Sequence, residues 1–192
     1  MANHSLDTTL FDKAVLFAVR AHAGTERRGK GFPYIIHPME AAEIVATITP
    51  DPELLAAAIL HDTVEDTSVT VEDIRREFGD RIASLVAAES DIELAGQSEE
   101  ESWHARKQAA IDRLAAASHD AKIVAMGDKL SNMRAISRDY AVIGDKLWNI
   151  FHVKEKSEHA WHYRGLAESL SELSDTFAYQ EFKELISKVF PE

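Results

Sequence analysis

The chain contains no cysteine. Disulfides and thiolate metal ligands are therefore excluded, and the cysteine content says nothing about the redox compartment. Basic residues are also scarce, because 33 Asp and Glu outnumber 21 Lys and Arg and give a formal net charge of −12. A protein that binds nucleic acid or an anionic membrane through charge needs a basic surface. We therefore expect neither kind of partner.

Long apolar runs are absent as well. No stretch approaches the ~20 apolar residues of a membrane-spanning helix. The first seven residues lack the basic start and the apolar stretch of a signal peptide, so a cytoplasmic protein is expected. At 192 residues, 45% hydrophobic and 28% charged, the chain is predicted to form a single globular domain, residues 1–192, with a real core.

Apolar residues recur at three- and four-residue spacing along most of the chain, and strand periodicity never exceeds a few residues. Asp51 can cap a helix that Pro52 opens, and Thr70 with Asp73 resembles a capping box. Residues 137–144 are expected to be a connector. The predicted architecture is all-α, a compact helical bundle with helices over 7–23, 39–47, 52–60, 102–117, 122–134, 146–152, 157–173 and 176–190.

The most informative stretch is residues 61–67, His-Asp-Thr-Val-Glu-Asp-Thr, with one imidazole and three carboxylates. It follows the apolar run 54–60, whose Ala and Leu residues predict a buried helix. Unpaired buried charge is costly, and a divalent cation held by His61 and Asp62 would compensate for it. From this stretch alone, an acidic turn that emerges into water is an equal alternative.

Two further segments offer ligands. His37 precedes Pro38, and the residue before a proline is disfavoured in the α region, so we expect His37 at a bend just before a helix. Such a His is either a ligand or a structural hydrogen-bonding residue. Asp128 and Asn132 lie four residues apart, on one face of the buried 122–134 helix. They form either a polar pair satisfied in the core or a pair that holds a ligand.

The loop 24–32 is rich in glycine and holds three cations, Arg27, Arg28 and Lys30. Glycines let backbone N–H groups approach a ligand closely, and the Arg guanidinium fits phosphate. The alternative is a solvated surface loop whose cations soften the acidic field.

For two other features we prefer a structural interpretation to a functional one. Residues 89–101 are polar and acidic, and are either a lid over a site or, more commonly for such a segment, a solvated linker. His152, His159 and His162 have the spacing of a metal box, but no carboxylate accompanies them. Aromatic-rich helices of this kind usually pack a core.

Together the segments predict a catalytic metal site. Two neutral nitrogens and two carboxylates suit one divalent metal with positions left for water, which then becomes a nucleophile near neutral pH. Glu65, one turn after His61, and its neighbour Asp66 can orient or deprotonate this water. Cations of the 24–32 loop can offset charge on a leaving group, which predicts a phosphohydrolase of a small phosphorylated metabolite. The four candidate ligands are His37, His61, Asp62 and Asp128.

These motifs resemble those of the HD-domain metal-dependent phosphohydrolases. Within that family the chain is similar to the alarmone hydrolases, which comprise the hydrolase half of RelA/SpoT proteins and a stand-alone metazoan homologue. The resemblance covers nearly the whole chain and is carried most specifically by residues 60–67 and 127–134, with further matches at 27–29 and 33–38.

The resemblance implies an Mn²⁺ ion, with Mg²⁺, Fe²⁺ and Zn²⁺ as alternatives, held by the four candidate ligands. It implies that Glu65 and Asp66 activate water. The implied reaction removes the 3′-pyrophosphate from guanosine tetra- or pentaphosphate. The residues expected at the nucleotide are Arg27, Arg28 and Asn132, together with their neighbours Lys30, Lys129 and Arg134.

The chain departs from the family's usual residues at five positions, none of them a metal ligand. Two other functions stay open: a phosphatase of another nucleotide, such as NADPH or a nucleoside phosphate, and a non-catalytic nucleotide sensor. The intact acidic pair argues against the sensor. The oligomeric state is open, a homo-oligomer included. The departures are Met126 for Leu, Gly127 for Ala, Arg28 for Lys, Lys30 for Thr and His162 for Tyr.

Overall fold

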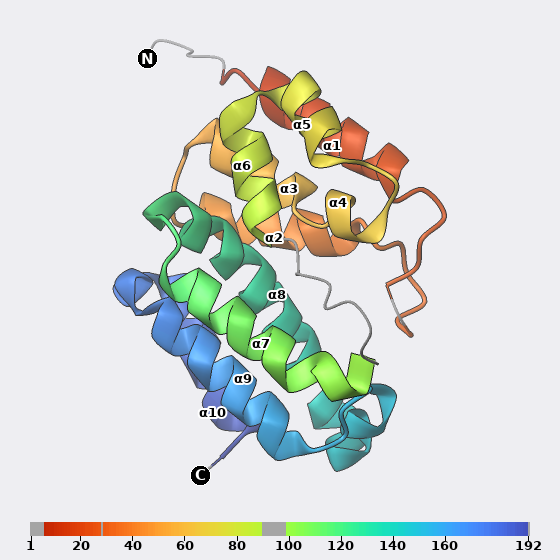
Figure 1. The fold of residues 1–192 in the computed structure, drawn as a ribbon, viewed down its shortest axis with the longest axis vertical. Helices are drawn as coiled ribbons and strands as arrows, with labels where there is room; N and C mark the ends of the chain where they lie inside the picture. Colours follow the sequence, from red (N-terminus) through yellow and green to blue (C-terminus); the bar gives the residue numbers. More distant parts are fainter. Residues whose placement is uncertain (1–5, 28, 90–98, 192) are drawn as a thin grey trace.

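The computed structural model describes residues 6–27, 29–89 and 99–191, with side chains in the last range described from residue 102 onward. These residues form helices joined by turns and irregular chain, with no strand among them, so the predicted all-α class is confirmed (Figure 1). No helix in the described ranges has both the length and the apolar character needed to cross a bilayer.

The first half of the chain builds one end of the molecule around a central buried helix (Figure 1). That helix, α3, is the predicted apolar one, and its residues 56–60 are almost fully buried. Asp51 caps it by accepting a hydrogen bond from the Glu53 amide at 2.9 Å, and the capping box of Thr70 and Asp73 also forms. The elements are α1 (Thr9–Ala21), α2 (Ile36–Ala46), α3 (Pro52–Leu60), α4 (Thr63–Asp66), α5 (Val71–Phe78) and α6 (Asp80–Glu89).

The second half packs four helices along one another, and α8 joins the two halves because it also contacts α2 and α3 (Figure 1). Residues 121–128 of α8 are buried without a break, so this helix has core on several sides. The elements are α7 (Glu99–Ala115), α8 (His119–Ile143), the 3-10 helix η1 (Gly144–Ile150), α9 (Lys156–Ser169), the 3-10 helix η2 (Ser171–Leu173) and α10 (Phe177–Val189).

Helices α2 and α8 approach each other unusually closely at Gly127. A Cβ atom at this position would lie 2.6 Å from the Ala41 carbonyl oxygen and 2.9 Å from a methyl group of Val45. The glycine therefore sets the spacing between the helices, and it directly precedes Asp128.

Two boundary predictions were wrong. Residues 137–144 are not a connector, because α8 continues to Ile143 and ends at Gly144 with a φ of 56°. Arg138 is exposed and Asp139 is half-buried on a helix that is held by the burial of Ile136 and Ser137. His37 lies inside α2 rather than before it. Pro38 falls in the first turn, where backbone N–H groups have no partner within the helix, so the proline costs no hydrogen bond.

Candidate metal centre

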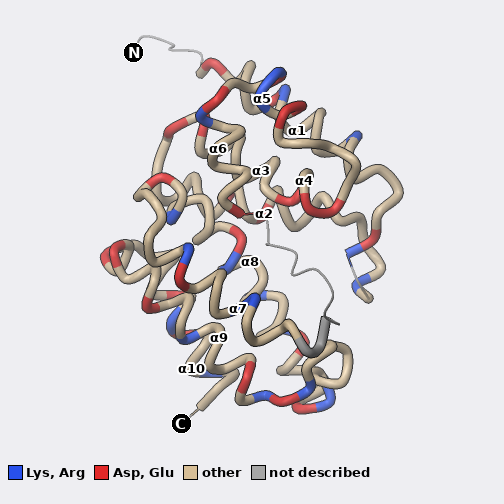
Figure 2. The backbone as a smooth tube through the Cα atoms, in the orientation of Figure 1, with Lys and Arg blue, Asp and Glu red and all other residues tan. Residues whose placement is uncertain are grey.

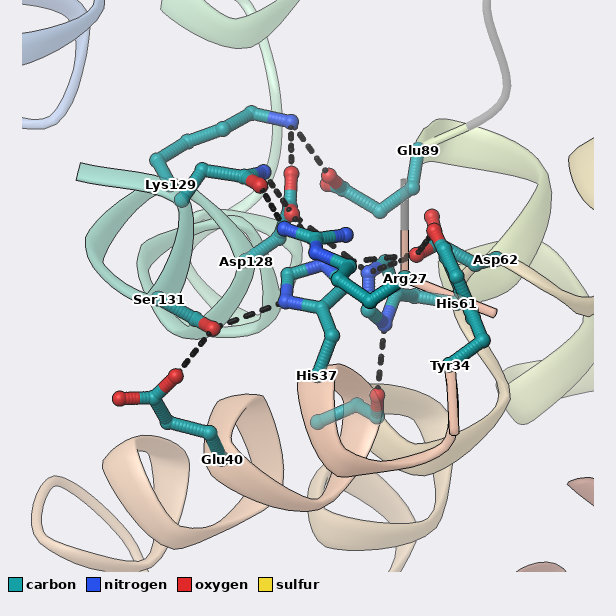
Figure 3. Close-up of polar contacts among 12 residues, drawn as sticks. Arg27, Tyr34, His37, Glu40, His61, Asp62, Glu89, Asp128, Lys129 and Ser131 are labelled. Atoms are coloured by element: carbon teal, nitrogen blue, oxygen red, sulfur yellow. Dashed lines mark hydrogen bonds and ion pairs between the residues drawn. The ribbon is translucent and has the colours of Figure 1, made fainter. Parts of the chain in front are cut away.

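Three helical segments bring His37, His61, Asp62 and Asp128 together (Figure 3). His37 is in the first turn of α2, His61 follows α3, Asp62 precedes α4, and Asp128 lies within α8. One ligand atom from each of His37, His61 and Asp128 lies within 4.8 Å of the other two, and all three residues are buried. Asp62 Oδ2 is 3.4 Å from His37 Nε2 and 3.0 Å from His61 Nε2.

The orientation of His61 leaves one nitrogen free of hydrogen bonds. Its Nδ1 lies 2.7 Å from the Ala58 carbonyl oxygen, and because a carbonyl only accepts, Nδ1 carries the proton. Nε2 is inaccessible to solvent and has no hydrogen-bond partner in the described part of the chain. Its lone pair points to the carboxylates, as a metal-binding imidazole requires.

His37 is oriented by a chain of hydrogen bonds from the opposite side. Its Nδ1 is 2.8 Å from Ser131 Oγ, and Ser131 Oγ donates to Glu40 Oε2 at 2.7 Å (Figure 3). The serine hydroxyl has one proton, which goes to the carboxylate, so Nδ1 of His37 donates to the serine. Nε2 of His37 then directs its lone pair to Asp128 Oδ1, 3.0 Å away.

Two imidazole lone pairs and two carboxylates therefore face one another in a buried space. A cation bound among them would offset the free-energy cost of burying these groups together. A proton on His61 offsets part of this cost. Burial alone would lower the pKa of His61, but the charges of Asp62 and Asp128 outweigh burial and raise this pKa well above its usual value. The donor set of nitrogen and carboxylate oxygen, with hydrogen-bonded imidazoles behind it, fits a divalent metal ion.

Asp128 is held by two neighbours on α8. Lys129 Nζ contacts Asp128 Oδ2 at 2.6 Å and Glu89 Oε2 at 3.1 Å, and Asn132 Nδ2 donates to Asp128 Oδ1. Burial would raise the pKa of Asp128, but Lys129 and the imidazoles hold it well below its usual value. Asp128 is therefore ionised, as a metal ligand must be. Arg27 reaches the same place and donates to Asn132 Oδ1.

Asp62 is held by Tyr34, whose hydroxyl donates to Asp62 Oδ2 at 2.6 Å. Burial and then the charge of Asp62 raise the pKa of Tyr34, so the phenol keeps its proton and acts as a donor. Glu65 and Asp66 follow on α4, which Figure 2 marks as acidic. Both residues line the same cavity as the candidate metal ligands.

This cavity has a volume of about 420 Å³ and extends from the metal centre into the space between α7, α8 and α9. Its lining includes the aromatic residues Trp103, Phe151 and Tyr163. Lys107 and Arg113 on α7 add basic groups to the lining. A cavity with a metal centre at one side and several cations suits a small polyanion.

The structure separates the remaining sequence candidates. Asn132, Lys129 and Arg27 are at the cluster, as described above. Lys30 forms an ion pair with Asp139 and lines a neighbouring groove. Arg134 binds Glu181 through two contacts of 2.7 Å and does not line the cavity. Arg28 and most of the 89–101 segment, considered as a linker or a lid, lie outside the described residues.

Sequence reasoning missed the residues that orient the candidate ligands. Tyr34 and Ser131 contact the candidate ligands Asp62 and His37 directly. Behind them, Glu40 accepts a hydrogen bond from Ser131, and Glu89 pairs with Lys129. Ser131 had a usable signal, because it follows Asp128 by three residues and so shares its helix face. The histidine trio is not a metal site in the described ranges: His159 instead binds the Val153 carbonyl and packs on Trp148.

The fold and this site define a class, and comparison with known proteins identifies it. The HD-domain family model matches residues 14–153, so the chain belongs to the HD-domain family. A guanosine-3′,5′-bis(diphosphate) 3′-pyrophosphohydrolase of Danio rerio is 36% identical over 135 residues, which is 68% of this chain and 71% of that protein. The Homo sapiens protein of the same name is 37% identical over 66% of this chain and 69% of that protein.

Longer proteins also match. A protein of the same name from Aquifex aeolicus is 35% identical over 65% of this chain, and the match spans only 17% of that protein. Among solved structures, that of a metazoan SpoT orthologue covers 96% of this chain and 97% of its own, with a TM-score of 0.74 at 21% identity, which shows the fold. A Listeria monocytogenes protein covers 84% of this chain and 98% of its own, with a TM-score of 0.70 at 27% identity. The predicted family and enzyme class, a metal-dependent hydrolase, are confirmed.

Proposed function

We propose that the chain is a metal-dependent guanosine-3′,5′-bis(diphosphate) 3′-pyrophosphohydrolase. One observation carries this proposal: two imidazole lone pairs and two carboxylates converge at the side of a cation-lined cavity of about 420 Å³. The relatives that bear this name match about two thirds of the chain. The family match over residues 14–153 includes all four candidate ligands.

The proposed metal is Mn²⁺, held by His37, His61, Asp62 and Asp128. A ligand set of imidazole nitrogen and carboxylate oxygen suits Mn²⁺ and Fe²⁺ better than an all-oxygen ligand set does. The same set is also compatible with Zn²⁺. A divalent ion bound there lowers the pKa of a water molecule and so supplies a nucleophile near neutral pH.

The acidic pair Glu65 and Asp66 supplies the base in this proposal. Both residues line the cavity beside the metal ligands, and a carboxylate within hydrogen-bond reach of the attacking water can accept its proton. Hydrolysis adds this water across the bond between the ribose 3′ oxygen and its phosphorus. The products are pyrophosphate and a nucleotide with a free 3′ hydroxyl.

The charged phosphates of the substrate are bound by cations on two sides. Arg27 faces the metal centre from the 24–32 loop, and Lys107 and Arg113 line the cavity from α7. Arg27 also lies over the Tyr34 ring, 5.4 Å from its centre. This contact holds the guanidinium beside the metal ligands, where it can offset charge on a phosphate.

Product analysis tests the proposal. Purified protein with Mn²⁺ is incubated with guanosine tetraphosphate, NADPH and nucleoside phosphates, and the products are identified by mass. We expect pyrophosphate and GDP from the tetraphosphate. Orthophosphate from NADPH with no turnover of the tetraphosphate would instead identify a phosphatase, and binding without turnover of any compound would identify a sensor.

A pair of variants tests the residue roles. Asp62→Ala should lose metal, measured by metal analysis after gel filtration. Glu65→Ala should keep its metal but lose turnover. Glu184, exposed on α10 and remote from the cavity lining, provides the matched control: Glu184→Ala should keep both. Full activity in the first two variants would overturn the assignments.

A further inference from the structure

The inner wall of the cavity contains a histidine that the proposed chemistry does not use. His162 lines the cavity from α9, near Trp103 on α7 at a ring distance of 6.0 Å and beside Tyr163 at 5.5 Å. Both rings meet the imidazole edge to face, at interplanar angles of 68° and 60°, and so restrict its rotation.

Neither nitrogen of His162 has a hydrogen-bond partner among the described residues. Nδ1 is inaccessible to solvent and unpartnered, whereas Nε2 is not enclosed in this way. A buried N–H without a partner is rarer in proteins than a buried acceptor without one. The proton of the neutral ring therefore belongs on Nε2, which presents an N–H donor to the cavity.

The charges around His162 keep it neutral and attract an anion. Burial is the main cause that lowers the pKa of His162 to about 2, and Lys107 on α7, Lys129 on α8 and His159 on α9 lower it further. The imidazole is therefore uncharged at neutral pH. The same two lysines draw a phosphate into the space that Nε2 faces.

We propose that His162 binds a phosphate group of the nucleotide through Nε2 as a neutral hydrogen-bond donor. This inference rests on the proposed function, because it concerns the same cavity.

Substitutions at this position separate hydrogen bonding from packing. His162→Phe keeps a ring against Trp103 but removes the donor, whereas His162→Gln restores a neutral donor. Loss of a hydrogen bond to a charged group lowers affinity by roughly tenfold to more than 100-fold. We expect His162→Phe to raise the KM for guanosine tetraphosphate, or the Kd for GDP or pyrophosphate, by about tenfold or more, with an unchanged melting temperature.

Three comparisons complete the test on the Mn²⁺-loaded protein. Guanosine, which has no phosphate, should bind the wild type and His162→Phe equally, and His162→Gln should recover most of the lost affinity. His152→Phe, at an exposed position that does not line the cavity, should bind like the wild type. Calorimetric Kd values for GDP and pyrophosphate measure phosphate binding by His162 even when no substrate is turned over. A failure of the proposed function can therefore be distinguished from a failure of this inference.

The inference is overturned by any of three results. One is unchanged binding of all phosphate ligands by His162→Phe. Another is an equal loss for guanosine. The third is a wild-type affinity that rises as the pH falls from 8 to 5 while that of His162→Gln does not, because this would show that a charged imidazole binds the phosphate.

Discussion

Replacing Gly127 by alanine should destabilise this protein. The added Cβ would lie 2.6 Å from the Ala41 carbonyl oxygen and 3.2 Å from its carbonyl carbon, which are backbone atoms of α2. Overpacking costs roughly 1–3 kcal/mol, and a clash with backbone lies in the upper part of this range. Alanine recovers about 1 kcal/mol of helix propensity relative to glycine. The expected net loss is about 1–2 kcal/mol.

Thermal unfolding in the presence of a chelator measures this loss without a contribution from metal. For a chain of this size, about 1 kcal/mol corresponds to roughly 2–4 °C, so the melting temperature of Gly127→Ala should fall by about 2–8 °C. Because α2 and α8 carry His37 and Asp128, the affinity for Mn²⁺ should fall as well.

Gly165 provides a matched control, because an added Cβ there would lie 2.6 Å from Ile111 Cδ1, the end of a flexible side chain. Ile111 can rotate, so Gly165→Ala should keep most of the helix-propensity gain and leave the melting temperature equal or higher. If Gly127→Ala is as stable as Gly165→Ala, the close approach of α2 and α8 is not what the structure indicates.

Three further predictions concern the site. Glu65→Gln should lower kcat by about 100-fold or more with unchanged metal content; retained kcat would rule out its role as a base. Ser131→Ala and Glu40→Gln should weaken Mn²⁺ binding by about 10- to 100-fold through the loss of His37 orientation, and unchanged calorimetric Kd values would contradict this. Without metal, the pKa of His61 is higher in the folded state than its unfolded value of 6.5, so protonated His61 stabilises the fold. This stabilisation is complete below pH 6.5 and is lost as the pH rises through the folded-state pKa. The metal-free melting temperature should therefore fall above neutral pH, less so in His61→Gln, whereas Mn²⁺ affinity should rise with pH because binding displaces this proton.

The helical architecture could be predicted because apolar spacing is a local property. The buried helix before His61 followed from its Ala and Leu content, and its cap followed from Asp51 and Pro52. The end of α8 could not be predicted in the same way. Its last turns begin with the polar run 137–139 and are helical because tertiary packing buries Ile136 and Ser137, and sequence spacing does not report packing from other helices. The expectation of one domain over residues 1–192 stays a prediction.

The candidate ligands were predictable from motifs, whereas the residues behind them were not. His61 and Asp62 are adjacent, and their chemistry is visible in the sequence. The chain from His37 through Ser131 to Glu40 depends on how closely α2 and α8 pack, and therefore on Gly127. The role of His162 depends on missing hydrogen bonds, which only a three-dimensional structure reveals.

Anomalous diffraction from Mn²⁺-soaked crystals tests the central claim, that distant segments of this chain share one cation. We expect a single strong peak within bonding distance of Nε2 of both His37 and His61 and of the carboxylates of Asp62 and Asp128. Crystals of Asp62→Ala should show no peak there. A peak elsewhere in the wild type, or none at this position under saturating Mn²⁺, would contradict the account.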